Sequence, residues 1–181
     1  MHKLLLHWEG GEDINIMTAL KRGFTLIELL IVIAILGVLA VVVLVAINPV
    51  QQLARTRDAG RMSTVAQLGH AAESYYTSHN GVYPPDFATL VTSGEINNIP
   101  SQVTNTLTSM CSGATDTANG WCYDMAASSF AIFSALEADT NLTIGTCTGT
   151  AHAAYLSLAG KGCIVCAAPG AATDVTACEN D

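Results

Sequence analysis

Glu28 is the one charged residue in an otherwise apolar run that extends from Phe24 to Ile47. A carboxylate in a membrane span costs about 2.5–3.5 kcal/mol at the bilayer centre and less near the interface. Glu28 lies close to the start of the run, so its side chain either extends to the lipid headgroups or pairs with a cation. On a helix, Phe24 lies about one turn away from it. A cation at Phe24 would therefore be within reach of this carboxylate.

Cysteine and histidine are the other residues whose side chains could do chemistry. Cys163 and Cys166 form a CxxC pair, which occurs in redox and zinc sites. A structural zinc site needs four ligands, and no second CxxC or paired histidine accompanies this one. His70 and His79 are nine residues apart and His152 is isolated. We predict that the three histidines are surface or packing residues, with no metal bound.

All six cysteines follow the apolar run. An even number of cysteines on one side of a membrane span indicates disulfides in an oxidising compartment. Six cysteines permit 15 connectivities, of which we predict Cys111–Cys122, Cys147–Cys163 and Cys166–Cys178.

Motifs of catalysis are missing from the sequence. Neither a nucleophile elbow nor a glycine-rich phosphate-binding loop is present. Asp116 and Asp124 lie in acidic loops that could bind calcium, and Asn141-Leu142-Thr143 fits a glycosylation sequon. We predict that the chain is not an enzyme and has no cofactor. Calcium binding is possible, but no motif supports it.

The apolar run is long enough to cross a membrane. A helix of this length would reach roughly 36 Å, against a hydrocarbon core of about 30 Å. Lys21 and Arg22 directly precede the run, and by the positive-inside rule they keep the N-terminus in the cytoplasm. The cysteine-rich part then lies outside, which agrees with the disulfide argument.

The stretch Lys21-Arg22-Gly23-Phe24-Thr25-Leu26-Ile27-Glu28 resembles the prepilin processing motif of type IV pilins and type II secretion pseudopilins. This resemblance continues through Leu29–Gly37. It implies that a prepilin peptidase cuts between Gly23 and Phe24 and methylates the new N-terminus. Residues 1–23 would then be a leader peptide, with Met17 as a candidate true start. A residue without Cβ at the cut, Gly23, lets the backbone approach a protease closely.

After such a cut, the new amino group of Phe24 is a cation within reach of Glu28. The pair can form within one helix or between neighbouring subunits, where it would set their axial offset. An unpaired charge in an apolar filament core is costly, so a wrong register is disfavoured. We therefore expect Glu28 to set the register of subunits during assembly. The alternative is that its side chain only extends to the lipid headgroups.

Residues 48–80 continue the helix after an interruption. Pro49 predicts a kink, and its position departs modestly from the family, in which a helix-bending proline often comes a few residues earlier. Apolar residues then recur at helical spacing, and Asn80-Gly81 ends the helix. The apolar positions are Leu53, Met62, Val65, Leu68, Ala72 and Tyr75. Arg55, Arg57, Asp58 and Arg61 fall elsewhere and are expected on a solvated or inter-subunit face.

Residues 81–181 are predicted to form a disulfide-containing β head. Prolines favour a turn-rich connector at its start, and Asn80–Pro85 also resembles pilin sequences. The strand candidates are Gly120–Met125, Ser129–Leu136, Ala153–Leu158 and Cys163–Ala167. The predicted fold is α+β: a long N-terminal helix, membrane-spanning over 24–47, whose second half packs on a three- or four-stranded antiparallel sheet.

The function that the resemblance implies is a structural subunit of a type IV pilus-like filament. The expected partners are further copies of the chain, minor pilins, the prepilin peptidase, an inner-membrane assembly platform and, before assembly, membrane lipid. From Phe24 onward 4 basic residues face 12 acids, so no nucleic-acid binding is expected. Before assembly the chain would be a single-pass inner-membrane protein, and afterwards part of a surface or periplasm-spanning filament. A type II secretion pseudopilin and a membrane-anchored extracytoplasmic binding domain are the alternatives.

Overall fold

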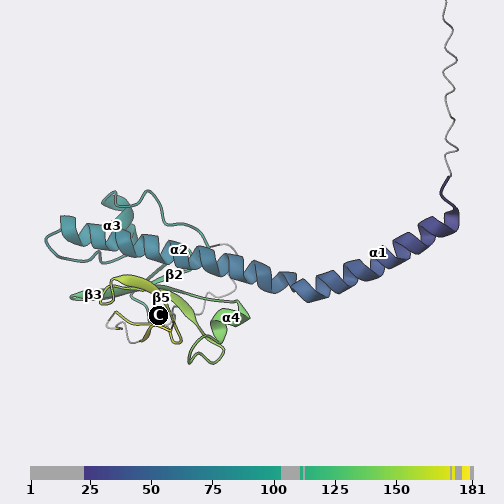
Figure 1. Ribbon diagram of the computed structural model, residues 1–181. Helices are drawn as coiled ribbons and strands as arrows, with labels where there is room; N and C mark the ends of the chain where they lie inside the picture. Colours follow the sequence, from purple (N-terminus) through teal and green to yellow (C-terminus); the bar gives the residue numbers. More distant parts are fainter. Residues whose placement is uncertain (1–22, 103–110, 112, 172, 174–176, 180–181) are drawn as a thin grey trace, which may run out of the picture. The chain divides into compact units, whose positions relative to one another are not determined.

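The computed structural model describes residues 23–102, 111, 113–171, 173 and 177–179. Their order is two long helices followed by a connector and a β-rich head, which is the predicted α+β class (Figure 1). Contacts divide the chain into two compact units after Val45. Each unit is described by itself below.

Helix α1 runs from Leu26 to Ile47, and all of its side chains are exposed. Asn48 ends it in a left-handed conformation with φ 45°. Pro49 then begins α2 (Pro49–Ser78) as its first helical residue. Proline suits this position because its missing N–H has no partner in the first turn of a helix. The interruption thus lies at the predicted place.

Helix α2 packs on the head through one buried stripe with steps of three and four residues, the period of an α-helix. The stripe is Ala54, Asp58, Arg61, Val65, Leu68 and Ala72. Leu53, predicted to lie on the apolar face, is exposed. After Ser78 the chain turns through Asn80 and Gly81, both with positive φ, where the helix end was predicted.

The head contains one antiparallel sheet of five strands in sequential order, one or two more than predicted. Each strand pairs with the next in sequence. The connections are short tight turns except between β3 and β4, where a longer segment intervenes. The strands are β1 (Asp116–Ala118), β2 (Trp121–Ala126), β3 (Ser129–Ala135), β4 (His152–Leu156) and β5 (Lys161–Val165). The last four coincide with the four strand candidates, while β1 was not predicted.

Alternating side chains give the sheet two buried faces. The face toward α2 carries the aromatic core of Tyr123, Phe130 and Tyr155. Gly69 of α2 lies so close to the Tyr155 ring that a Cβ there would overlap it. The glycine is thus what allows the helix and sheet to approach.

The disulfides are Cys111–Cys122, Cys147–Cys166 and Cys163–Cys178. The first is the predicted pair, but the other two predicted pairs, Cys147–Cys163 and Cys166–Cys178, are wrong. Cys163 packs in the cluster on the far face of the sheet, where Cys178 also lies. Cys166, three residues further along, belongs to the cluster on the α2 face, with Cys147. Cys163 is on β5 and Cys166 directly follows this strand. Because the two cysteines pack on opposite sides of the sheet, each bonds the cysteine on its own side, and the two bonds cross in sequence.

The connector between α2 and β1 contains a helix that was not predicted, α3 (Phe87–Thr92). Asp86 caps it by accepting a hydrogen bond from Thr89 N at 2.7 Å. The Tyr123 hydroxyl donates to Pro84 O at 2.6 Å, and Trp121 Nε1 donates to Pro100 O at 2.7 Å. The connector is therefore fastened to the sheet by buried aromatic side chains.

Candidate assembly site

The residues around the predicted cut are fully accessible. Gly23, Phe24 and Thr25 precede α1 without regular secondary structure. Phe24 is 83% exposed, and no described atom lies within 4 Å of where a Cβ on Gly23 would be. An irregular, open backbone is what a peptidase needs in order to bind the chain in extended form. Lys21, Arg22 and the candidate start Met17 lie outside the described residues.

Glu28 has a partner in the uncut chain, and it is Thr25. The Glu28 carboxylate accepts from Thr25 N and from Thr25 Oγ1, both at 2.9 Å. Glu28 N donates to Thr25 Oγ1 at 3.2 Å. This reciprocal arrangement is a capping box, with Thr25 as N-cap and Glu28 at the third helical position. The signal was in the sequence as Thr-x-x-Glu directly before an apolar run, and our sequence analysis missed it.

The capping box places the one acidic side chain of α1 at its N-terminal end, where the helix dipole favours negative charge. The pairing of Glu28 with the amino group of Phe24 stays a prediction, because that amino group exists only after cleavage.

The surface of α1 is uniformly apolar beyond Glu28. Within the described residues, the helical stretch Leu26–Ser78 contains the one segment long and apolar enough to cross a membrane. An apolar helix with no buried side chain needs either lipid or other apolar helices around it. This surface can thus serve first as an anchor and then as a packing surface.

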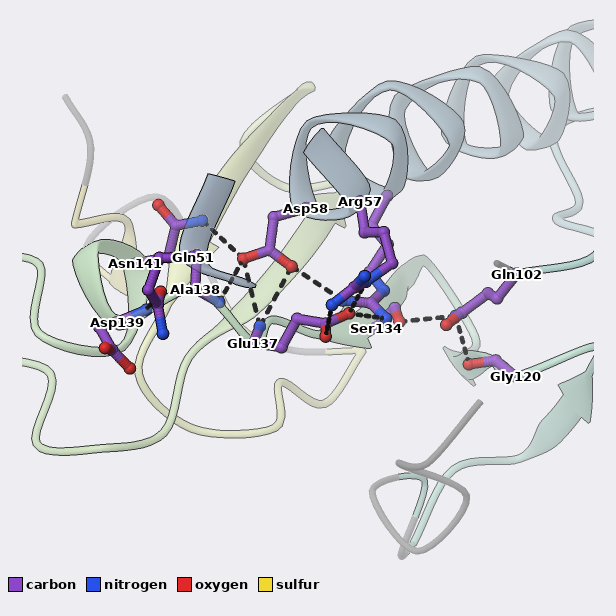
Figure 2. Close-up of polar contacts among 11 residues, drawn as sticks. Gln51, Arg57, Asp58, Gln102, Gly120, Ser134, Glu137, Ala138, Asp139 and Asn141 are labelled. Carbon is purple, nitrogen blue, oxygen red and sulfur yellow. Dashed lines mark hydrogen bonds and ion pairs between the residues drawn. The ribbon is translucent and has the colours of Figure 1, made fainter. Parts of the chain in front are cut away.

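A second polar site fixes α2 to the head, and it lies wholly within the second unit (Figure 2). Asp58 at its centre is 0% exposed. Its carboxylate accepts hydrogen bonds from Arg61 Nη1 at 2.8 Å, Glu137 N at 3.1 Å, Ala138 N at 2.9 Å and Asn141 Nδ2 at 2.8 Å. A buried carboxylate is tolerated when its lone pairs are satisfied in this way.

Asp58 also caps the short helix α4 (Asp139–Leu142) from a distance. The N-cap of α4, Ala138, has no side chain that can accept a hydrogen bond. Asp58 accepts from Ala138 N, and Gln51 Oε1 accepts from Asp139 N at 3.1 Å. Two side chains of α2 thus replace the missing cap.

Two arginines and two carboxylates balance the charge of this site. Glu137 receives a bidentate pair from Arg57, with Nε–Oε1 2.9 Å and Nη2–Oε2 2.6 Å. Arg61 Nη2 lies 2.6 Å from Glu137 Oε1. Hydrogen bonds from Arg57, and secondarily from Arg61, hold the pKa of Glu137 below its ordinary value, although burial opposes them.

The solvated face predicted for the charged residues of α2 is therefore wrong for two of them. Asp58 and Arg61 are buried, with Arg61 only 4% exposed, while Arg55 is exposed as predicted. Asp58 and Arg61 share the helical spacing of Ala54 and Val65, which was the available signal. The amide of Asn141, in the predicted sequon, is already engaged with Asp58.

Comparison with known proteins adds to this geometry. A family described as the prokaryotic N-terminal methylation motif matches residues 19–44. The type IV major pilin protein PilE of Neisseria gonorrhoeae is 41% identical over 75 residues, which are 39% of this chain and 40% of that protein. The N-terminal segment thus carries this methylation motif and is similar to a type IV major pilin. The chain thus spans less than half the length of the pilin that it matches. No solved structure matches the chain.

The prepilin motif covers Gly23, Phe24 and Glu28 and most of α1. Its described residues are exposed. At the start of the helix, the capping box of Thr25 and Glu28 provides side-chain hydrogen bonds. The family match is to structural subunits rather than to enzymes.

The histidines and acidic residues that were considered for metal binding have ordinary positions in the fold. His152 is buried, whereas His70 and His79 are exposed. Asp116 accepts from Phe87 N at 2.9 Å, and Asp124 accepts from Ala171 N at 2.8 Å. Among the described residues, no group of three or more acids, histidines or cysteines is arranged to hold a metal ion.

Proposed function

We propose that the chain is the precursor of a structural subunit of a type IV pilus-like filament. A prepilin peptidase cuts it between Gly23 and Phe24 and methylates Phe24. The mature subunit then leaves the inner membrane through an assembly platform and joins copies of itself and minor pilins. The similarity to a major pilin supports our choice of a pilus, and a secretion pseudopilus is the alternative.

One observation carries this proposal: the prepilin motif lies on a helix that buries none of its side chains against the described residues. A tether for a binding domain would also be apolar, but it would have no reason to keep an acid four residues after the Phe24 that follows the proposed cut. A head-to-tail contact that does not close on itself generates a helical polymer. Helix α1 supplies one side of such a contact.

The energetics of α1 suit transfer between a membrane and a filament. Lipid tails and a bundle of aliphatic helices are similarly apolar, so exchange between them gains little. Exposure to water would cost roughly 1.5–3 kcal/mol for each large aliphatic side chain. The helix therefore stays in one apolar environment or the other.

The proposed role of Glu28 is to fix the register between subunits by pairing with the methylated amino group of Phe24. Glu28→Ala should lower filament yield by at least about tenfold, since a tenfold change corresponds to only about 1.4 kcal/mol. The measurement is the amount of sheared filament relative to the amount of subunit in the membrane.

Thr25→Ala is the matched control, because it removes the two hydrogen bonds of the Thr25 hydroxyl and leaves both the Glu28 carboxylate and its hydrogen bond from the backbone N–H of residue 25. It should change filament yield far less than Glu28→Ala does. Equal losses in the two variants would assign Glu28 to helix capping alone. An unchanged yield in Glu28→Ala would refute the assembly role and favour a simple membrane tether.

A further inference from the structure

The apolar surface of the chain does not stop where α1 stops. Ile47, Val50 and Leu53 are 51%, 67% and 60% exposed, and all three belong to the same unit as the head. Gln52 is exposed between them, while Ala54 turns toward the head and is buried. The first turn of α2 thus continues the apolar character of α1 past the break at Asn48.

Arg55 ends this apolar stretch. It is exposed, and it makes no hydrogen bond or ion pair with any of the described residues. The other two arginines of α2, Arg57 and Arg61, are held by Glu137 and Asp58. Arg55 is therefore the arginine of α2 that the described part of the chain leaves available for another partner.

The position of Arg55 in the sequence fits the outer edge of a membrane span. Arg55 is the first charged residue after Glu28, and it follows Ile47, the end of the apolar run, by eight residues. A basic side chain just past the end of a span is expected to extend to the lipid headgroups on that side.

We propose that the first two turns of α2 bind the outer-leaflet headgroups of the membrane before assembly. Val50 and Leu53 contact the border of the acyl chains, and the Arg55 guanidinium binds lipid phosphate. Guanidinium and phosphate match in charge and in hydrogen-bond geometry. Leu53 and Arg55 lie about 160° apart around the helix, as they should if the helix passes through the interface rather than lying on it.

The proposal rests on the proposed role of α1 as the membrane-spanning helix. It adds a phosphate-binding arginine and two apolar contacts, Val50 and Leu53, at the outer surface of the membrane. Arginine and lysine side chains near helix ends extend to the interface in this manner, with the apolar stem along the acyl chains.

Photo-crosslinking of the full-length chain in vesicles tests the contact. The probe is Leu53→benzoylphenylalanine, in vesicles of phosphatidylcholine with phosphatidylglycerol, and adducts are identified by mass spectrometry. The matched control is Gln67→benzoylphenylalanine, at an exposed position further along the same helix. Phospholipid adducts are expected at position 53 and not at position 67.

Arg55 is tested in the same vesicles. Arg55→Glu should reduce the phospholipid adduct at position 53 several-fold, and Arg55→Lys should largely retain it. Lys161→Glu makes the same change of charge on β5 and should leave the adduct unchanged.

Crosslinks from position 53 only to a second copy of the chain would overturn the proposal and assign this surface to subunit packing. Chain retained in the membrane without any adduct at position 53 would overturn it too. Chain released from the vesicles by an alkaline wash would instead contradict the spanning role of α1, so the two failures are distinguishable.

Discussion

Asp58 is the residue on which the attachment of α2 to the head most depends. It is fully buried and accepts hydrogen bonds from four residues, one of them the buried Arg61. Its removal leaves a buried guanidinium with one partner fewer and leaves the start of α4 with the cap from Gln51 alone. Interactions of this kind contribute little as a pair but cost much when one partner is removed.

We expect Asp58→Ala to lower the free energy of unfolding by about 3–5 kcal/mol, the range for breaking a buried ion pair. Gln52→Ala, at an exposed position of the same helix, should change it by no more than about 0.5 kcal/mol. Urea denaturation of the full-length chain in detergent, followed by tryptophan fluorescence, measures both. Equal effects in the two variants would show that the site contributes no more than an ordinary surface contact.

His152 gives the head a dependence on pH. Both of its ring nitrogens lack a hydrogen-bond partner among the described residues. The side chain lines a cavity of about 270 Å³ together with Glu137, whose charge is already balanced by Arg57 and Arg61. Burial lowers the pKa of His152, so the folded state disfavours the protonated ring.

Because the unfolded chain binds a proton at His152 more readily, stability should fall as the pH drops below about 6.5, by at most about 1.4 kcal/mol per pH unit. His152→Leu should remove this slope between pH 6.5 and 5, and it should run parallel to the unmodified chain from pH 8 to 7. Denaturant midpoints across this range provide the test. A slope that persists in His152→Leu would assign it to another group.

Below about pH 4.5, a second loss of stability is expected from Glu137. Because the pKa of Glu137 is lowered in the folded state, its charge stabilises the fold at pH values above the ordinary pKa of glutamate. That contribution disappears as the pH falls through the folded pKa.

Helix α2 is attached to the head by different contacts in its first part and in its middle. Its first part is held by the polar site around Asp58, and its middle packs closely on the sheet at Gly69. Gly60, by contrast, has open space where a Cβ would be. The two glycines of one helix therefore serve different purposes.

Gly69→Ala should destabilise the head by about 1–3 kcal/mol, the usual cost of overpacking, because the new methyl overlaps the Tyr155 ring. Gly60→Ala should instead stabilise it by up to about 1 kcal/mol through helix propensity. Thermal or urea unfolding of the two variants measures both changes in stability. A similar gain in both would show that the helix and sheet are less closely packed than the structure indicates.

The elements that the sequence predicted were those with a local signal. The apolar run, the break at Pro49, the helix end at Asn80-Gly81 and four strands followed from periodicity and turn residues. The short elements β1, α3 and α4 were not predicted. For α4 the reason is that its start is capped by Gln51 and Asp58, which lie far away in sequence.

Pairings between distant residues were also out of reach. The disulfide Cys147–Cys166 depends on which side of the sheet each cysteine packs, which is decided by contacts between distant segments. The burial of Asp58 depends on a partner 80 residues away, Ala138. Polar residues in a helix suggest a solvated face, and only the three- and four-residue spacing with Ala54 and Val65 contradicts it.

At the scale of the whole molecule, the chain separates two tasks. Helix α1 has an apolar surface with one acid, while the head has its own core, three disulfides and a charge-balanced site on α2. This division suits a precursor whose helix leaves the membrane with the head already folded.

The central claim is that this chain is cut before Phe24 and then polymerises. Mass spectrometry of the N-terminal peptide from sheared surface filaments tests it most directly. We predict a peptide that begins at N-methylated Phe24 and retains Glu28. Filaments whose subunits begin at Met1 or Met17 would contradict the account.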